Sequence, residues 1–124
     1  MVAIANTVAA IAMAFTTAMA APAQSAIEAR STGAVTYYYP GLGACGETNS
    51  EGDHIVAISA AIFDSQRPCN RNIRVSYEGR SVQVRVVDRC AGCAHNEIDL
   101  SPAAFKEVIG SLDKGRVTAS WEWA

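Results

Sequence analysis

The chain has 124 residues, half of them hydrophobic, which is enough for one domain with a modest core. Ten basic and twelve acidic side chains give it a formal net charge of −2 at pH 7. A phosphate-binding surface needs clustered Lys and Arg, and this sequence has no such cluster, so we expect no nucleic-acid partner.

The first twenty residues carry no charged side chain and end in the small-x-small sequence Ala18-Met19-Ala20. This layout is typical of a secretory signal peptide. A membrane anchor would need about 20 continuous apolar residues, and polar residues interrupt this stretch. We therefore predict a signal peptide over 1–20, a flexible leader over 21–32, one domain over 33–124, and a secreted, extracellular protein without a membrane partner.

All four cysteines follow the predicted signal: Cys45, Cys69, Cys90 and Cys93. An even number in a small secreted domain predicts two disulfides. The alternative is a zinc site, because Cys90 and Cys93 have ligand spacing and His95 is close. An oxidising compartment argues against free thiolates, so we expect neither a metal nor a cofactor. Of the three possible pairings we favour two long-range bridges over a Cys90–Cys93 ring.

The first half of the domain shows two strand patterns. Residues 34–39 are rich in β-branched and aromatic side chains and stop at Pro40-Gly41, which predicts a strand and a turn. A glycine-rich loop follows over 41–46. Residues 54–59 predict a buried strand, and 60–64 a helical turn.

The second half begins with the clearest local pattern in the chain. Apolar and polar residues alternate over 73–77 and again over 82–86, with a Glu-Gly-Arg turn between them, which predicts a β-hairpin. A Cys/Gly loop over 89–97 and a short extended piece over 98–100 come next. Ser101-Pro102 starts a helix that Gly110 ends.

The closing residues 117–123 alternate strictly, so Trp121 and Trp123 share one face, for which we predict core packing. For the same reason Tyr38 must face away from Tyr37 and Tyr39. Five or six short strands and one short helix suit a closed or nearly closed barrel, because closure removes exposed strand edges.

Three stretches in order carry a family resemblance: 36–46 with its Gly-Ala-Cys-Gly end, 86–93 with its Val-Val-Asp-Arg-Cys start, and 98–105 with its Ile-Asp-Leu-Ser-Pro start. With the closing strand they resemble the double-psi β-barrel domain of expansins, which loosenins, barwin-like proteins and the rare-lipoprotein-A family share. The resemblance covers 33–123. It implies a mainly β fold, a six-stranded double-psi β-barrel with one or two short helices, stabilised by disulfides.

The resemblance also implies a site. Asp99 is the residue on which activity depends in this family, and Asp88, Thr36 and Tyr38 line the same substrate-binding groove. Desolvation and a neighbouring carboxylate would raise the pKa of such an Asp, which could then donate a proton to a sugar oxygen. The structural alternatives are that Asp99 helps to cap the following helix and that Asp88 forms a surface ion pair with Arg89.

Related endoglucanases on this barrel supply a catalytic base from the first strand, where this chain has tyrosines and Pro40 and no acidic residue before Glu47. We therefore expect a non-hydrolytic monomer that binds and loosens a cell-wall polysaccharide, whether cellulose, chitin or peptidoglycan. One alternative is a lytic transglycosylase that uses Asp99 alone. Another is a secreted protease inhibitor or effector that binds a host protein through the loops around Cys45 and Cys90.

Overall fold

The computed structural model describes residues 30–124, so the predicted signal peptide and all but the last residues of the leader lie outside the described part. The elements in chain order are β1 (Ser31–Tyr37), β2 (Ile55–Ser59), α2 (Ala60–Gln66), β3 (Asn72–Tyr77), β4 (Arg80–Cys90), β5 (Ile98–Leu100), α3 (Pro102–Ile109), the 3₁₀ turn η1 (Leu112–Lys114) and β6 (Val117–Trp123). No helix over this range is both long enough and apolar enough to span a membrane.

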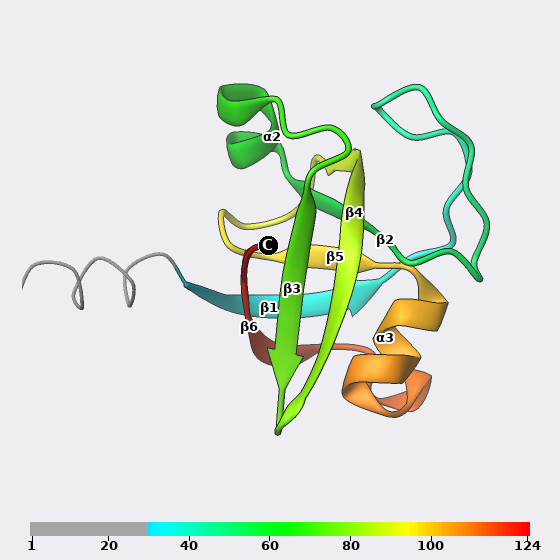
Figure 1. The fold of residues 1–124 in the computed structure, drawn as a ribbon, viewed down its shortest axis with the longest axis vertical. Coiled ribbons are helices and arrows are strands. Elements are labelled where there is room, and N and C mark those ends of the chain that lie inside the picture. The colour runs from blue at the N-terminus through cyan, green and yellow to red at the C-terminus, as the bar shows by residue number, and fades with distance from the viewer. Residues whose placement is uncertain (1–29) are drawn as a thin grey trace, which may run out of the picture.

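Six strands close into one barrel in the order β1-β5-β2-β4-β3-β6 (Figure 1). The β1–β5 and β2–β4 pairs are parallel and the other four pairs are antiparallel. The predicted fold, a mainly β six-stranded barrel with short helices and disulfides, is confirmed.

The strand ends differ from the sequence prediction at β1. The predicted strand ran over 34–39, whereas β1 begins at Ser31 and ends at Tyr37, so Ser31 and Thr32, which we assigned to the leader, belong to the barrel. They pair with Trp121 and Ser120 of β6. Small polar residues at a strand start have no distinctive pattern, and only the partner strand reveals them.

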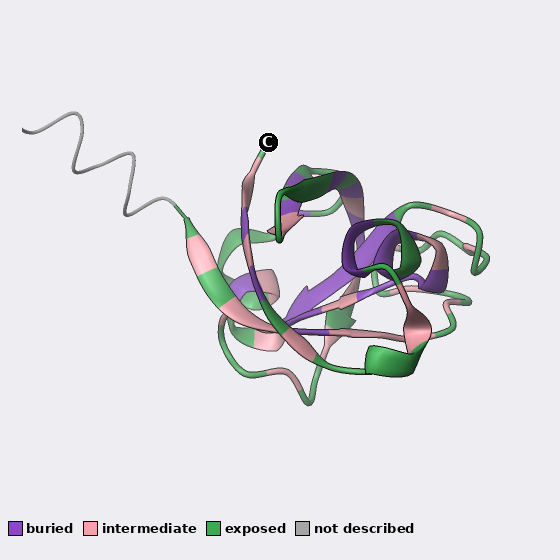
Figure 2. Cartoon of the chain, turned by 90° about the horizontal axis from the view of Figure 1, so that it is seen from below, coloured by how far each residue is buried: buried purple, intermediate pink, exposed green. Residues whose placement is uncertain are grey.

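The core fills the inside of the barrel. Side chains that point inward from all six strands are buried there, and Phe105, Val108 and Ile109 of α3 cover one end. Figure 2 colours the chain by burial, and its buried stretches lie toward the middle of the molecule. The Ser101 hydroxyl accepts a hydrogen bond from Ala104 N at 3.2 Å, and Pro102 is the first helical residue, as predicted. Most of the buried apolar side chains therefore lie inside the barrel, and polar side chains can occupy the outer face of the strands.

The aromatic residues of the end strands follow the alternation. Trp121 is 2% exposed, and Trp123 packs partly buried against the core, as predicted. Tyr37 packs against Phe105 with ring centroids 4.9 Å apart, whereas Tyr38 faces outward.

Both disulfides form, but the preferred pairing was wrong. Cys45 pairs with Cys69, and Cys90 pairs with Cys93. A tight turn after β4, in which Cys93 N approaches Cys90 O at 3.4 Å, places the two Cα atoms 5.4 Å apart, so the short ring fits without displacing the backbone.

Candidate functional site

Four outward-facing residues form a row across four neighbouring strands. Thr36 of β1 pairs with Asp99 of β5, Asp99 pairs with Ala57 of β2, and Ala57 pairs with Asp88 of β4. We call these four residues the carboxylate row. The inward neighbours of Asp99, Ile98 and Leu100, are fully buried, which fixes Asp99 on the outer face.

Ala57 sets the distance between the two carboxylates. It is the register partner of both aspartates, so their backbones lie two strand spacings apart, about 10 Å. Its side chain is a single methyl group and is only 3% exposed, so other side chains cover the space between the two carboxylates. Both carboxyl groups lie on the same outer face of the barrel.

A β-bulge brings Asp88 into the row. Val56 pairs with Val86, but Ala57 pairs with Asp88, so Val87 is the extra residue on β4. In a regular strand Val86 and Asp88 would face the same way, into the core. The bulge reverses Asp88 and turns its carboxylate outward.

The loop between β1 and β2 holds this carboxylate in place. Asp88 Oδ1 accepts hydrogen bonds from the backbone N–H groups of Ala44 and Arg89, both at 2.8 Å. Cys45 N donates to the carbonyl oxygen of Val87 at 3.1 Å, which fixes the loop on the bulge. Gly43 makes the contact possible, because a Cβ there would lie 2.4 Å from that same oxygen.

Asp99 has a different environment. Its Oδ1 accepts a hydrogen bond from the Thr36 hydroxyl at 3.0 Å. Burial raises the pKa of Asp99 above its ordinary value; the Thr36 hydrogen bond lowers it, and the negative charges of Glu97 and Asp88 raise it further. Burial prevails, so Asp99 holds its proton more readily than an ordinary aspartate does.

Tyr38 continues the row beyond the end of β1. Its backbone N–H donates to Leu100 O at 2.9 Å, so the pairing with β5 extends by one residue. Its hydroxyl is buried beside both carboxylates and has no well-formed hydrogen bond within residues 30–124. Burial, with the charges of Asp88 and then Asp99, raises the pKa of Tyr38 above its ordinary value, so the hydroxyl stays a hydrogen-bond donor.

The two structural alternatives for the aspartates are both wrong. Ser101, and not Asp99, caps α3. Arg89 forms its ion pair with Asp64, with two N–O contacts of 2.9 Å, and not with Asp88. Neither carboxylate of the row therefore caps a helix or forms a salt bridge among the described residues.

The structure brings together all four residues that the resemblance implied, Thr36, Tyr38, Asp88 and Asp99. Sequence reasoning missed Ala57, because an alanine inside an apolar run shows nothing of its partners. It also missed Gly43 and Ala44 as the support of Asp88. The glycine-rich loop over 41–46 was predicted, but its contact with β4 was not identifiable from the sequence.

Comparisons with known proteins agree with this fold. The family model described as "Lytic transglycolase", a double-psi β-barrel domain, matches residues 30–120. A papain inhibitor of Streptomyces mobaraensis is 38% identical over 112 residues, which cover 83% of this chain and 78% of that protein.

Two solved structures are similar as well. The Streptomyces papain inhibitor has a TM-score of 0.69 at 36% identity, over 77% of this chain and 94% of that chain. A mutant expansin of Clavibacter michiganensis in complex with cellohexaose has a TM-score of 0.69 at 24% identity, over 77% of this chain and 50% of that one. The expansin match shows a shared fold.

Proposed function

The chain belongs to the double-psi β-barrel family described as lytic transglycolase, and from this membership we propose that it is an extracellular protein that binds and loosens a cell-wall polysaccharide without hydrolysing it. The polymer is cellulose, chitin or peptidoglycan. Asp99 is the central residue of the binding site, and Asp88, Thr36 and Tyr38 contact the same polysaccharide.

The carboxylate row is the observation that carries this proposal. Sugar polymers present hydroxyl groups at regular intervals, and the row offers acceptors and donors in one line. Asp88, with one oxygen already held by two backbone N–H groups, accepts hydrogen bonds through its remaining capacity. The protonated form of Asp99, which burial favours, donates them.

The same geometry argues against hydrolysis. An inverting glycosidase holds an acid and a base on opposite sides of the scissile bond, with a water molecule beside the base. Asp88 and Asp99 both rise from the same outer face of the barrel, so a bound chain meets them from one side. β1, the source of the base in related endoglucanases, brings only the hydroxyls of Thr36 and Tyr38 to the row.

Binding and sugar release test this proposal together. The protein with both disulfides intact is incubated with cellulose, chitin and peptidoglycan, and the bound fraction and the soluble sugars are measured. We expect binding to one polymer without release. Asp99→Ala should weaken that binding about tenfold, because it removes hydrogen bonds to a chargeable group.

Two further variants sharpen the result. Asp99→Asn keeps the shape and a donor group and should bind almost as the wild type does, and Asp113→Asn, at an exposed carboxylate outside the row, is the matched control. Soluble sugar that appears with the wild type and is lost in Asp99→Asn would identify a lytic transglycosylase instead, since Asn cannot transfer a proton. Binding to none of the three polymers would refute the proposal.

A second candidate function is inhibition of a papain-like cysteine protease. It is favoured by the similarity to the papain inhibitor and by two exposed apolar side chains near the loop that the Cys45–Cys69 disulfide anchors. Tyr39 is 64% and Leu42 is 76% exposed. Apolar and aromatic side chains of this kind serve as anchors in protein interfaces.

Papain activity against a peptide substrate distinguishes this candidate. An inhibitor that works through this loop would lose potency in Leu42→Ala and keep it in Asp99→Ala. The polysaccharide proposal expects no inhibition by either variant or by the wild type.

A further inference from the structure

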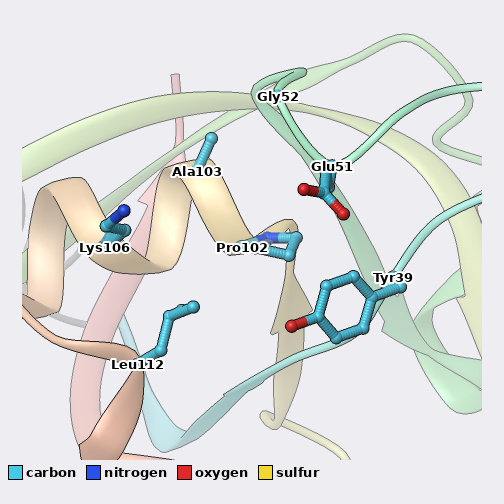
Figure 3. A pocket seen from close by; sticks show the side chains of 7 residues that line it. All are labelled: Tyr39, Glu51, Gly52, Pro102, Ala103, Lys106 and Leu112. Carbon is cyan, nitrogen blue, oxygen red and sulfur yellow. The ribbon is translucent and has the colours of Figure 1, made fainter.

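A second hollow lies beside α3, outside the carboxylate row (Figure 3). Its volume is about 240 Å³, and its walls come from the segment after β1, the loop before β2, the start of α3 and η1. Four of the lining side chains offer a ligand an aromatic ring, a charge or an apolar surface: Tyr39, Glu51, Lys106 and Leu112.

Two further aromatic rings hold Tyr39 in position. Its ring makes an edge contact with Tyr37, with centroids 6.2 Å apart, and Tyr37 in turn packs on the fully buried Phe105. In Figure 3 the Tyr39 ring extends into the space between Pro102 and Leu112. An exposed aromatic ring that is supported in this way loses little freedom when a ligand covers it, so the surface is prepared for binding.

The polar groups of the hollow carry one charge of each sign. The Glu51 carboxylate and the Lys106 ammonium form no hydrogen bond or ion pair with another side chain among the described residues, and they lie on opposite sides of the space (Figure 3). The Glu51 carbonyl accepts from Ala103 N at 3.1 Å, which fixes the loop against α3 and uses a backbone donor of the helix start. A ligand with a single charge would be attracted by one of these groups and repelled by the other, whereas a neutral ligand with several hydroxyl groups can hydrogen-bond to both.

We propose that this hollow binds one neutral sugar ring, as a subsite next to the carboxylate row. A sugar ring has an apolar C–H face that fits the Tyr39 ring, and hydroxyls that can donate to Glu51 and accept from Lys106. The volume lies below the roughly 300 Å³ at which pockets for larger organic ligands begin, and is right for a single ring. A protein partner would instead cover about 800 Å² of surface.

The hollow and the row share two chain segments. Tyr38 faces the carboxylates and Tyr39, the next residue, faces the hollow. Asp99 on β5 is likewise three residues before Pro102, which lines the hollow. These shared segments connect the hollow to the row, and this inference rests on the proposed polysaccharide-binding function.

Calorimetric titration with cellohexaose, chitohexaose and soluble peptidoglycan glycan strands tests the subsite. For the oligosaccharide that the wild type binds, we expect Tyr39→Ala to weaken affinity about fivefold and Tyr39→Phe to change it little. Leu42→Ala is the matched control, because Leu42 is at least as exposed and lies close by in the same loop, outside the hollow. Amide shifts of Gly52 and Ala103 in NMR spectra should accompany binding in the wild type.

The outcomes separate the two proposals. If no oligosaccharide binds the wild type, the proposed function fails and the subsite fails with it. If binding is normal in Tyr39→Ala, or equally weak in Leu42→Ala, the subsite is refuted and the function stands. Papain inhibition that Tyr39→Ala lowers, with sugar affinity unchanged, would assign the hollow to a protein partner and also refute the subsite. Tyr39 is exposed, so the variants should fold, and thermal unfolding verifies this.

Discussion

The Asp99 carboxyl group is partly buried, and its charged form is costly in the folded protein. Its pKa is raised by burial above the ordinary value of 3.8, despite the Thr36 hydroxyl. Between the ordinary and the raised pKa the folded protein binds a proton that the unfolded chain has released. The free energy of unfolding therefore falls as the pH rises through this window, and the loss is complete above it.

Asp99→Asn should remove this loss. At pH 7 we expect the variant to melt at a higher temperature than the wild type, and below the ordinary pKa of Asp the difference should vanish. Thermal unfolding followed by circular dichroism from pH 3 to pH 8 measures it. A difference that does not depend on pH would mean that the Asp99 charge is not the cause.

At the scale of elements, the contact between the β1–β2 loop and the β4 bulge supports Asp88. Gly43→Ala places a Cβ against the carbonyl oxygen of Val87, which cannot move unless the bulge moves with it. The loop would then shift, and the hydrogen bond from Ala44 N to Asp88 would be lost. We expect a loss of roughly 2 kcal/mol in the free energy of unfolding and weaker polymer binding. Gly41→Ala is the control, since a Cβ there meets nothing within 4 Å. Equal stability of the two variants in urea unfolding would contradict this account.

Ala57 offers a second test at this scale, directed at the space between the carboxylates. Its methyl group is only 3% exposed, so Ala57→Val should push aside the side chains that cover it. Valine suits a strand, so the fold should survive while polysaccharide binding falls about tenfold. Ala34→Val, two residues before Thr36 on the outer face of β1, lies outside the row and should bind as the wild type does. Normal binding by Ala57→Val in the pull-down would show that the packing between the aspartates does not matter for the ligand.

Local patterns in the sequence were sufficient for most elements. The alternation over 73–86 gave the hairpin, and Ser101, Pro102 and Gly110 gave the bounds of α3. The positions of Thr36 and Asp99 in one groove were implied by the family resemblance and not by a local pattern. The bulge did not, because Val86-Val87-Asp88 has the same apolar pattern with or without an extra residue, and only pairing with β2 distinguishes the two.

At the scale of the whole molecule, the two disulfides should differ in their contribution to stability. The Cys45–Cys69 bridge spans 24 residues and the Cys90–Cys93 bridge spans three. Chain entropy gives about 3.5 kcal/mol for the longer loop and about 2 kcal/mol for the shorter. Replacing Cys45 and Cys69 together by Ser should lower the melting temperature more than replacing Cys90 and Cys93. The reverse order would show that the turn after β4, and not the loop on β4, limits stability.

The place of β6 in the barrel has a consequence for the time at which the protein can fold. This strand is the last one in the chain, yet it lies between β1, the first, and β3. While a ribosome is still adding residues before Val117, both neighbouring strands have an open edge and the core has no Trp121. Contacts between such distant parts of a chain form slowly. The barrel therefore cannot close before β6 has been synthesised, and until then the chain must protect two open strand edges.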